Sequence, residues 1–394
     1  MAKRTILLRP SGPTSAFRAS AGALTTTIAV SVPVFLVGGL AVQIGDELHF
    51  SPAGLGLAVS AYFGASALAS VPAGHLVERF GATRVSRAGI LLAVASLLGV
   101  AAFARTLWSL ILILALGAGA NAMGQLASNT ALSRHVPPRR QGLSFGIKQA
   151  AIPVATLLSG AAVPVVALTL GWRWAFVFVA GLAASALLLV PNDPEVATVR
   201  SKNRAKRATR ALVVVGVGAT LAAGSANALG TFLVDSAVAQ GISPGPAGLA
   251  LTLGGAVCAT SRVLGGWLAD RWPDRSISVI SALLLAGALG LALMAVPGGL
   301  PLIAGVVLGF GFGWAWPGLM NFAVVRLHPQ APAAATSITQ TGVYAGGCLG
   351  PLGLGTLATT TSYPTMWVVA AIAMLGAAAA MLLGSHLLRR HTAA

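Results

Sequence analysis

The chain has 394 residues, of which 56% are hydrophobic and only 8% are charged, and its formal net charge is +17. Soluble domains carry about 25% charged residues, so this composition excludes an ordinary water-soluble protein and indicates a chain whose solvent is lipid. The basic excess does not indicate nucleic-acid binding. The basic residues lie at the edges of apolar segments, which is the arrangement that the positive-inside rule describes.

Apolar segments long enough to cross a bilayer follow one another along the chain, since a spanning helix needs about 20 mostly apolar residues. We predict twelve spans, at residues 19–43, 52–74, 86–104, 107–131, 142–168, 171–191, 211–236, 245–268, 277–296, 300–325, 333–358 and 363–388. The polar, strongly basic stretch between the sixth and seventh spans is interpreted as a cytoplasmic linker. The predicted organisation is a tail (1–17), a six-helix bundle (18–191), the linker (192–210), a second six-helix bundle (211–388) and a tail (389–394).

The distribution of Lys and Arg predicts the orientation. With both termini inside, 21 of the 25 basic residues fall on the cytoplasmic side, and only Arg105 and Arg173 fall outside. We therefore predict a multi-pass protein of the inner (plasma) membrane with both termini in the cytoplasm. The two cysteines, Cys258 and Cys348, lie far apart in apolar segments and are interpreted as helix-packing residues.

The two halves of the chain repeat at a constant offset of 192 residues. Six spans separate equivalent positions, so both halves have the same orientation and are related by a pseudo-two-fold axis along the membrane normal. The predicted fold is an all-α membrane protein with a parallel repeat, which is an architecture of transporters. The matched pairs are Arg18 and Arg210, Ser51 and Ser243, Gly74 and Gly266, Asn129 and Asn321, and Arg134 and Arg326.

A motif of glycines and charges, GHLVERFGATR, follows the second span at residues 74–84. It resembles the signature of the major facilitator superfamily, whose glycine, acidic and basic positions are filled here by Gly74, Glu78, Arg79, Gly81 and Arg84. The family usually has Asp where this chain has Glu. The resemblance covers almost the whole chain and implies a membrane transporter of twelve helices.

The second half carries a copy of this motif, GWLADRWPDR, which keeps Gly266, Asp270 and Arg271 but has Pro273 in place of glycine. An acidic side chain at this position can cap the N-terminus of a neighbouring helix or pair with arginine. We therefore predict that the motif residues of both halves form a gate at the cytoplasmic side. The alternative is that Glu78 and its counterpart are ordinary loop charges.

Polar residues recur every four positions in three spans, which places each set on one helix face. Inside a bilayer such groups need partners or water. In the superfamily the first, fourth, seventh and tenth spans line the central cavity, so the resemblance places two of these sets at the substrate. Hydrogen bonding between packed helices is the alternative. The sets are Asn121, Gln125 and Asn129; Asn227, Thr231 and Asp235; and Thr336, Gln340 and Tyr344.

Two cations lie within spans. Lys148 is seven residues after Gln141 and therefore about 10 Å into the fifth span. Its ammonium either faces a cavity and attracts an anion or extends back to the cytoplasmic surface. Arg262 leans toward the midplane, because its span runs inward and side chains lean toward the helix N-terminus. The segment SRVLGGWLAD is similar to the arginine region of the oxalate and monocarboxylate branches of the superfamily, which implies anion contact; interhelical packing is the alternative.

We predict a secondary transporter that works by alternating access and carries a small organic anion, a carboxylate. The alternatives are an exporter of amphipathic or drug-like compounds, and a non-transporting membrane sensor or assembly protein. No enzyme motif, cofactor, metal or nucleic-acid site is expected, and the protein is expected to function as a monomer in the lipid bilayer. A coupling proton and a counter-transported anion both remain open. The predicted substrate-binding residues are Lys148, Arg262, Asn121, Gln125, Asn227, Thr231, Gln340 and Trp314.

Overall fold

The computed structural model describes residues 13–137, 140–191, 209–271, 276–327 and 332–393, so most of the predicted linker and of the N-terminal tail lies outside the described residues. The regular structure in these ranges is helical. The elements are α1 (Pro13–Gly39), α2 (Ala41–Leu48), α3 (Pro52–Phe103), α4 (Leu107–Gly117), α5 (Gly119–His135), α6 (Gln141–Gln149), α7 (Ala151–Ala162), η2 (Val163–Ala167), α8 (Trp172–Ser185), η3 (Ala186–Leu188), α9 (Thr209–Ala239), α10 (Pro244–Ala269), α11 (Ser276–Met294), α12 (Gly299–Leu308), η5 (Gly309–Gly313), α13 (Pro317–Leu327), α14 (Pro332–Thr360) and α15 (Tyr363–Ala393).

The helix α3 contains two membrane spans. Gly81, with φ 80° and ψ 163°, is the non-helical residue at which the chain turns back. We expected a loop over residues 75–85, whereas helix continues on both sides of this glycine. A single residue suffices, because glycine has no Cβ to oppose a positive φ.

Eight helices are long and apolar enough to cross a membrane, within the part of the chain that the structure describes. Two shorter apolar helices, Trp172–Leu188 and Ser278–Met294, lie at predicted spans six and nine. With α3 counted twice and α14 added, these helices account for the predicted twelve spans. The apolar length of the segments therefore predicted the fold class correctly.

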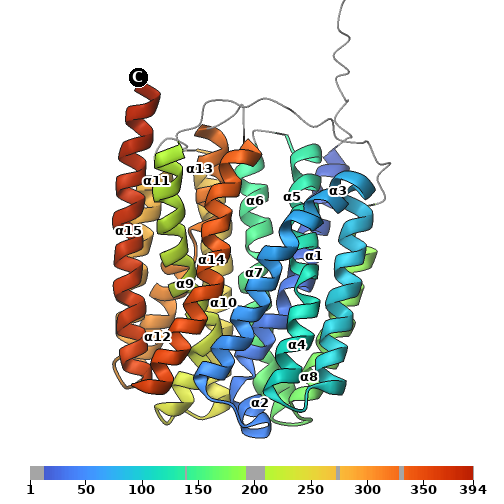
Figure 1. The fold of residues 1–394 in the computed structure, drawn as a ribbon, viewed down its shortest axis with the longest axis vertical. Coiled ribbons are helices and arrows are strands. Elements are labelled where there is room, and N and C mark those ends of the chain that lie inside the picture. Colours follow the sequence, from blue (N-terminus) through green and yellow to red (C-terminus); the bar gives the residue numbers. More distant parts are fainter. Residues whose placement is uncertain (1–12, 138–139, 192–208, 272–275, 328–331, 394) are drawn as a thin grey trace, which may run out of the picture.

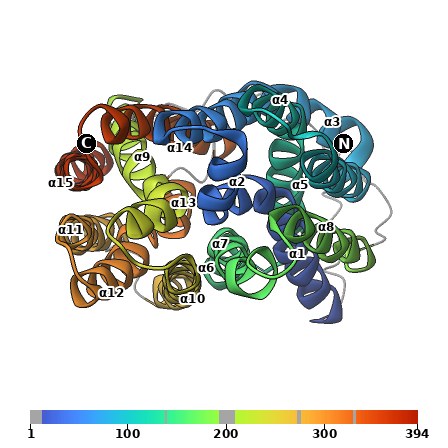
Figure 2. The same cartoon turned by 90° about the horizontal axis from the view of Figure 1, so that it is seen from below.

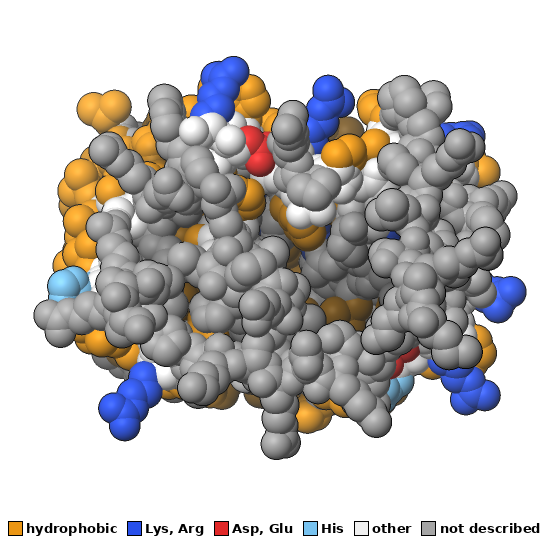
Figure 3. All heavy atoms as spheres, turned by 90° about the horizontal axis from the view of Figure 1, so that it is seen from above, with side chains coloured by type: hydrophobic (Ala, Val, Ile, Leu, Met, Phe, Trp, Pro, Cys, Tyr) orange, Lys and Arg blue, Asp and Glu red, His pale blue; other side chains and the backbone are white. Residues whose placement is uncertain are grey.

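The helices form one bundle with two groups seen from below, α1–α8 on one side and α9–α15 on the other (Figure 2). The upper end in Figure 1 is here named the basic face, because exposed arginines lie at the helix ends there. Figure 3 shows basic side chains around the rim of this face. The lower end, where α2, α4, α8 and α12 are found, is the opposite face. The exposed arginines at the basic face are Arg18, Arg79, Arg84, Arg134, Arg140, Arg210 and Arg271.

Glycines at equivalent positions bring the two groups of helices together near the opposite face. A Cβ at Gly56 of α3 would lie 2.2 Å from the carbonyl oxygen of Pro351 in α14. A Cβ at Gly248 of α10 would lie 2.7 Å from the Cβ of Val163 and 2.8 Å from the oxygen of Gly160. Gly56 and Gly248 differ by the repeat offset of 192 residues. The same position thus permits close helix contact in both halves of the chain.

Candidate functional site

Two cations from opposite halves are buried inside the bundle. Lys148 on α6 is 1% exposed and Arg262 on α10 is 2% exposed. Neither forms an ion pair with a carboxylate in the described part of the chain. Removing a cation from water costs several kcal/mol unless it is paired and hydrogen-bonded. Two such residues in one region are therefore a functional feature to be explained.

The ammonium of Lys148 points into the bundle. It donates a hydrogen bond to the side-chain oxygen of Gln125 on α5, and Gln125 is itself only partly buried. An ammonium has three N–H donors, and this amide oxygen is its recorded acceptor. The geometry therefore favours the interior orientation over extension to the basic face.

The guanidinium of Arg262 joins the two halves through backbone carbonyls. Nη1 donates to the oxygen of Gln149 at 2.7 Å, while Nε and Nη2 donate to the oxygen of Trp314 at 3.0 and 2.7 Å. Pro153 lies four residues after Gln149 and has no N–H to occupy that carbonyl. Trp314 ends the π-helix η5 with φ −113°, three residues before Pro317. Interrupted helices thus supply both acceptors, and the geometry favours a packing role for this guanidinium.

Three of the predicted cavity residues form hydrogen bonds with other groups of the helix bundle. Asn121 on α5 donates to the hydroxyl of Ser66 on α3 at 3.3 Å. Asn227 donates to the carbonyl of Ala223 at 2.8 Å, and Thr231 donates to the carbonyl of Asn227 at 2.8 Å, both within α9. The contact of Asn121 joins two helices and favours the packing alternative, whereas the bonds of Asn227 and Thr231 stay within α9 and favour neither alternative.

Trp314 is buried under the rings of two phenylalanines. It makes edge-on contacts with Phe35 and Phe310, each at 5.6 Å between ring centroids. The guanidinium carbon of Arg262 lies 5.6 Å from the centroid of the Trp314 ring. Trp314 therefore contacts Arg262 twice, through its indole ring and through its backbone carbonyl.

A neutral polar cluster lies between α3 and α14. The hydroxyl of Tyr344 interacts with the side chains of Ser70 and Gln340. Ser70 also donates to the carbonyl of Ser66 at 2.8 Å. Gln340 thus lies beside other hydrogen-bonding groups. The side chain of Thr336 lies outside the described residues.

The second copy of the motif caps α6. The carboxylate of Asp270 accepts from the backbone N–H of Gly142 at 3.1 Å and of Leu143 at 2.9 Å. A Cβ at Gly266 would lie 2.7 Å from the oxygen of Gly142, so only glycine permits this approach. The guanidinium carbon of Arg271 lies 3.4 Å from the ring centroid of Trp267.

The first copy is more open. Glu78 is exposed and has no recorded hydrogen bond within the described residues. Arg79 lies over the ring of Phe80 at 5.1 Å. The side chains at residues 333–338 of α14, which include the repeat equivalents of the α6 N-terminus, lie outside the described residues. Gly74 is half-buried, and a Cβ at this position would lie 4.0 Å from the side chain of Leu126. Arg84 is exposed.

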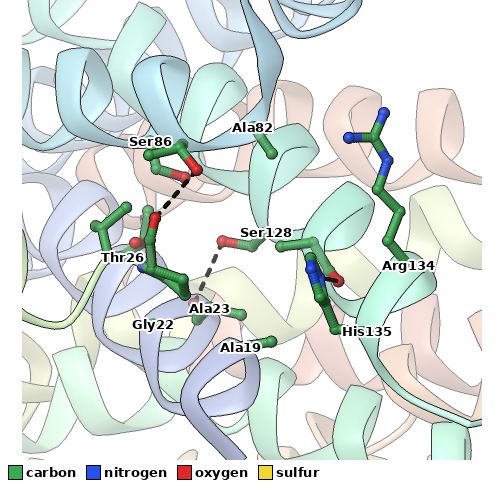
Figure 4. A pocket seen from close by; sticks show the side chains of 13 residues that line it. Ala19, Gly22, Ala23, Thr26, Ala82, Ser86, Ser128, Arg134 and His135 are labelled. Atoms are coloured by element: carbon green, nitrogen blue, oxygen red, sulfur yellow. Dashed lines mark hydrogen bonds between the residues drawn. The ribbon is translucent and has the colours of Figure 1, made fainter. Parts of the chain in front are cut away.

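A pocket on the basic face is separate from the buried cations. Figure 4 shows it between α1, α3 and α5, with the side chains of Ser86, Ser128, Arg134 and His135 around it. Ser128 donates to the carbonyl of Ala23 at 3.3 Å there. None of the predicted substrate-binding residues lines this pocket.

Two buried acceptors escaped the reasoning from sequence. The side-chain oxygen of Gln149, in a residue that is 8% exposed, has no hydrogen-bond partner among the described residues. A Cβ at Gly318 of α13 would lie 3.9 Å from the Gln149 side chain, which places that side chain against α13. The side-chain oxygen of Asn321, three residues further along α13, is also buried and has no partner in the part of the chain that the structure describes. The one sequence feature that could have indicated the Gln149 acceptor is its position next to Lys148.

Comparison with known proteins adds the family. The family model described as Major Facilitator Superfamily matches residues 21–351 and 215–393. A bacterial homologue of the human lysosomal transporter Spinster is similar in structure in its inward-facing, unoccupied conformation, with a TM-score of 0.72, 17% identity, and coverage of 96% of this chain and 98% of that one. Its inward-facing, occupied conformation matches with a TM-score of 0.68, 16% identity and 97% coverage of each chain.

Proposed function

Because the chain belongs to the major facilitator superfamily and is therefore a multi-pass membrane transporter and not an enzyme, we propose that its substrate is a small organic anion carrying a carboxylate. The protein alternates between states open to either side by rocking its two helix groups about a central site. The site lies at the level of Lys148.

The buried ammonium of Lys148 is the observation that carries this proposal. It is 1% exposed, it bonds to a neutral amide, and no described carboxylate balances its charge. A bound carboxylate would supply the missing charge and accept stronger, charge-assisted hydrogen bonds. In the absence of substrate, Gln125 accepts a hydrogen bond from the ammonium of Lys148. The carboxylate of the substrate replaces Gln125 as the acceptor when it binds.

Arg262 contributes mainly through its charge. Its recorded donors hold the carbonyls of Gln149 and Trp314, so the guanidinium is fixed between the two halves. In a low-dielectric interior its positive potential reaches a neighbouring anion without direct contact. The proposed order of importance is therefore Lys148 first and Arg262 second.

The gate and the orientation belong to the same proposal. Asp270 holds the N-terminus of α6 from the opposite half of the chain, so this contact must break when the basic face opens. The basic face is proposed to be cytoplasmic, in the inner membrane, with both termini on that side, because exposed arginines gather there.

The test is ligand binding by the purified full-length protein, followed by thermal shift. Small carboxylates should stabilise the wild type, and Lys148→Gln should reduce their affinity by about 10- to 100-fold, because a charge-assisted hydrogen bond contributes about 1.5–3 kcal/mol. Lys148→Arg should retain more affinity than Lys148→Gln, since it keeps the charge. Thr356→Val, an exposed change on α14, is the control.

Two results would contradict the anion proposal. If hydrophobic cations stabilise the protein and carboxylates do not, or if Lys148→Gln binds carboxylates as well as the wild type, the anion proposal is wrong. An exporter of amphipathic compounds would then fit the aromatic surroundings of Trp314.

A further inference from the structure

Two polar clusters lie at the same depth in the bundle. The hydrogen bond of 3.3 Å from Asn121 to Ser66 fixes α5 against α3. Gln125 and Ser70 each follow these residues by four positions, and both helix segments run toward the basic face. One helical turn rises about 5.4 Å, so Gln125 and Ser70 each lie one turn closer to that face. Both residues are only partly buried.

Gln125 and Ser70 each contact a further helix. Gln125 accepts from Lys148 on α6, and Ser70 interacts with Tyr344 on α14. Tyr344 in turn interacts with Gln340 one turn earlier on its own helix. Polar side chains of four helices therefore form a layer across the bundle, with contacts from α6 to α5 and from α14 to α3.

The internal repeat shows that this layer is charged at one end only. Gln340 follows Lys148 by 192 residues, and Arg262 follows Ser70 by the same 192 residues. The two pairs thus occupy equivalent positions, yet one pair consists of two cations and the other of an amide and a hydroxyl. A symmetric dianion would find a cation at one end and neutral groups at the other.

The chemistry of the neutral end favours a hydroxyl over a second carboxylate. A buried polar group needs a partner, and leaving it unpaired costs about 1–3 kcal/mol. A fully ionised carboxylate offers acceptors only, whereas a hydroxyl group both donates and accepts. Ser70, Gln340 and Tyr344 carry donors and acceptors and no charge, so a hydroxyl matches them better than a carboxylate does.

We infer that the transported anion is a hydroxylated monocarboxylate. Its carboxylate binds at Lys148, and its neutral hydroxyl end faces the cluster of Ser70, Gln340 and Tyr344. This inference rests on the proposed function, because it assumes that Lys148 binds a carboxylate.

The test uses three probes that share a four-carbon chain and differ at the far end: butyrate, 4-hydroxybutyrate and succinate. Binding is measured on the purified full-length protein. 4-Hydroxybutyrate should bind about 3- to 10-fold more tightly than butyrate, since a neutral hydrogen bond contributes about 0.5–1.5 kcal/mol. Succinate should bind more weakly than 4-hydroxybutyrate, because its second charge finds no cation.

Two variants address the neutral end directly. Tyr344→Phe should bring the affinity for 4-hydroxybutyrate down toward that for butyrate, so that the ratio of the two affinities falls toward one. Gln340→Lys places a cation at the position equivalent to Lys148 and should reverse the preference, so that succinate binds more tightly than 4-hydroxybutyrate. Thr356→Val, which is exposed on the same helix, should change none of the three affinities.

The outcomes separate the two proposals. If wild-type protein binds succinate as tightly as 4-hydroxybutyrate or more so, while Lys148→Gln abolishes both, the hydroxyl inference is wrong and the anion proposal stands. If none of the probes binds, or if Lys148→Gln changes no affinity, the anion proposal fails and the inference fails with it.

Discussion

The carboxylate of Asp270 holds the first turn of α6 through the backbone N–H of Leu143, at 2.9 Å, although the two residues belong to opposite halves of the chain. The neighbouring N–H of Gly142 donates to the other carboxylate oxygen at 3.1 Å. A helix N-terminus carries partial positive charge and N–H groups without intrahelical partners. The contact therefore stabilises the arrangement in which the two halves meet at the basic face.

Removing this carboxylate should favour the state in which the basic face is open. Asp270→Asn keeps one acceptor oxygen and should shift the equilibrium by about fivefold, whereas Asp270→Ala should shift it by about tenfold or more, because hydrogen bonds to charged groups contribute about 1.5–3 kcal/mol. Distances between spin labels on α6 and α10 at the basic face would report the shift.

Glu78→Gln is the matched comparison. Its carboxylate is exposed and has no recorded hydrogen bond in the described ranges, so the same spin-label distances should change less than in Asp270→Asn. Equal shifts in both variants would show that the two motif copies act alike. Unchanged distances in Asp270→Ala would show that this carboxylate is an ordinary surface charge.

Close glycine contacts should be needed to keep the opposite face closed. Gly56→Ala would place a Cβ 2.2 Å from the carbonyl oxygen of Pro351, and overpacking of this kind costs about 1–3 kcal/mol. We expect a lower melting temperature and wider spin-label distances between α3 and α14 near the opposite face. Gly353→Ala, which meets no atom within 4 Å, should change neither quantity. Normal stability in Gly56→Ala would mean that the two helices can separate freely.

Reasoning from sequence succeeded for features that depend on long segments. Apolar length determines whether a segment spans a bilayer, and the constant offset of 192 residues is a property of the sequence itself. It was less accurate for short features. The helix α2 and the single-residue turn at Gly81 depend on local packing and on one φ angle, which hydropathy does not encode.

The roles of individual polar residues could be predicted only in part. The spacing of Asn121 and Gln125 placed them on one face of α5, but it did not predict which side chain each of them would contact. Arg262 was left between two roles, although Pro153 already implied that the carbonyl of Gln149 lacks a helical donor. Relating a freed carbonyl to an arginine more than a hundred residues away requires the tertiary structure.

The proposed orientation predicts the accessibility of the basic linker. In a variant whose native cysteines are replaced by alanine, a cysteine at Ser201 should not react with an impermeant thiol reagent added outside intact cells. A cysteine at Arg105, which is exposed at the opposite face, should react readily. Labelling in the reverse pattern would invert the topology.

An ion pair at the opposite face should make stability depend on pH. Arg173 donates to the carboxylate of Glu47 at 2.5 Å and Trp172 donates to it at 2.7 Å, and the hydrogen bond from Arg173 holds the pKa of Glu47 below its usual value of 4.5. The contribution is present above about pH 4.5 and is lost as the pH falls through the lowered pKa.

Glu47→Gln should therefore destabilise the protein at pH 7 by less than about 1 kcal/mol, because the pair is partly exposed to solvent. Melting temperatures of wild type and variant, measured from pH 7 to pH 3, should converge at the acidic end. A constant difference over this range would show that the ionised carboxylate is not the stabilising group.

The two buried cations should have opposite effects on stability. Lys148→Met removes an ammonium that no carboxylate balances in the described part of the chain, and it should stabilise the protein by about 1–4 kcal/mol while abolishing anion binding. Arg262→Met leaves the carbonyls of Gln149 and Trp314 without their donors and should destabilise it by about 1–3 kcal/mol for each.

Thermal unfolding of both variants in the absence of ligand would test this contrast, with Arg18→Met, at an exposed arginine, as the control that should change little. A natural protein retains a destabilising buried charge where function requires it. If Lys148→Met instead lowers the melting temperature as much as Arg262→Met does, the lysine is a structural residue held by Gln125, and the anion site must be sought elsewhere in the bundle.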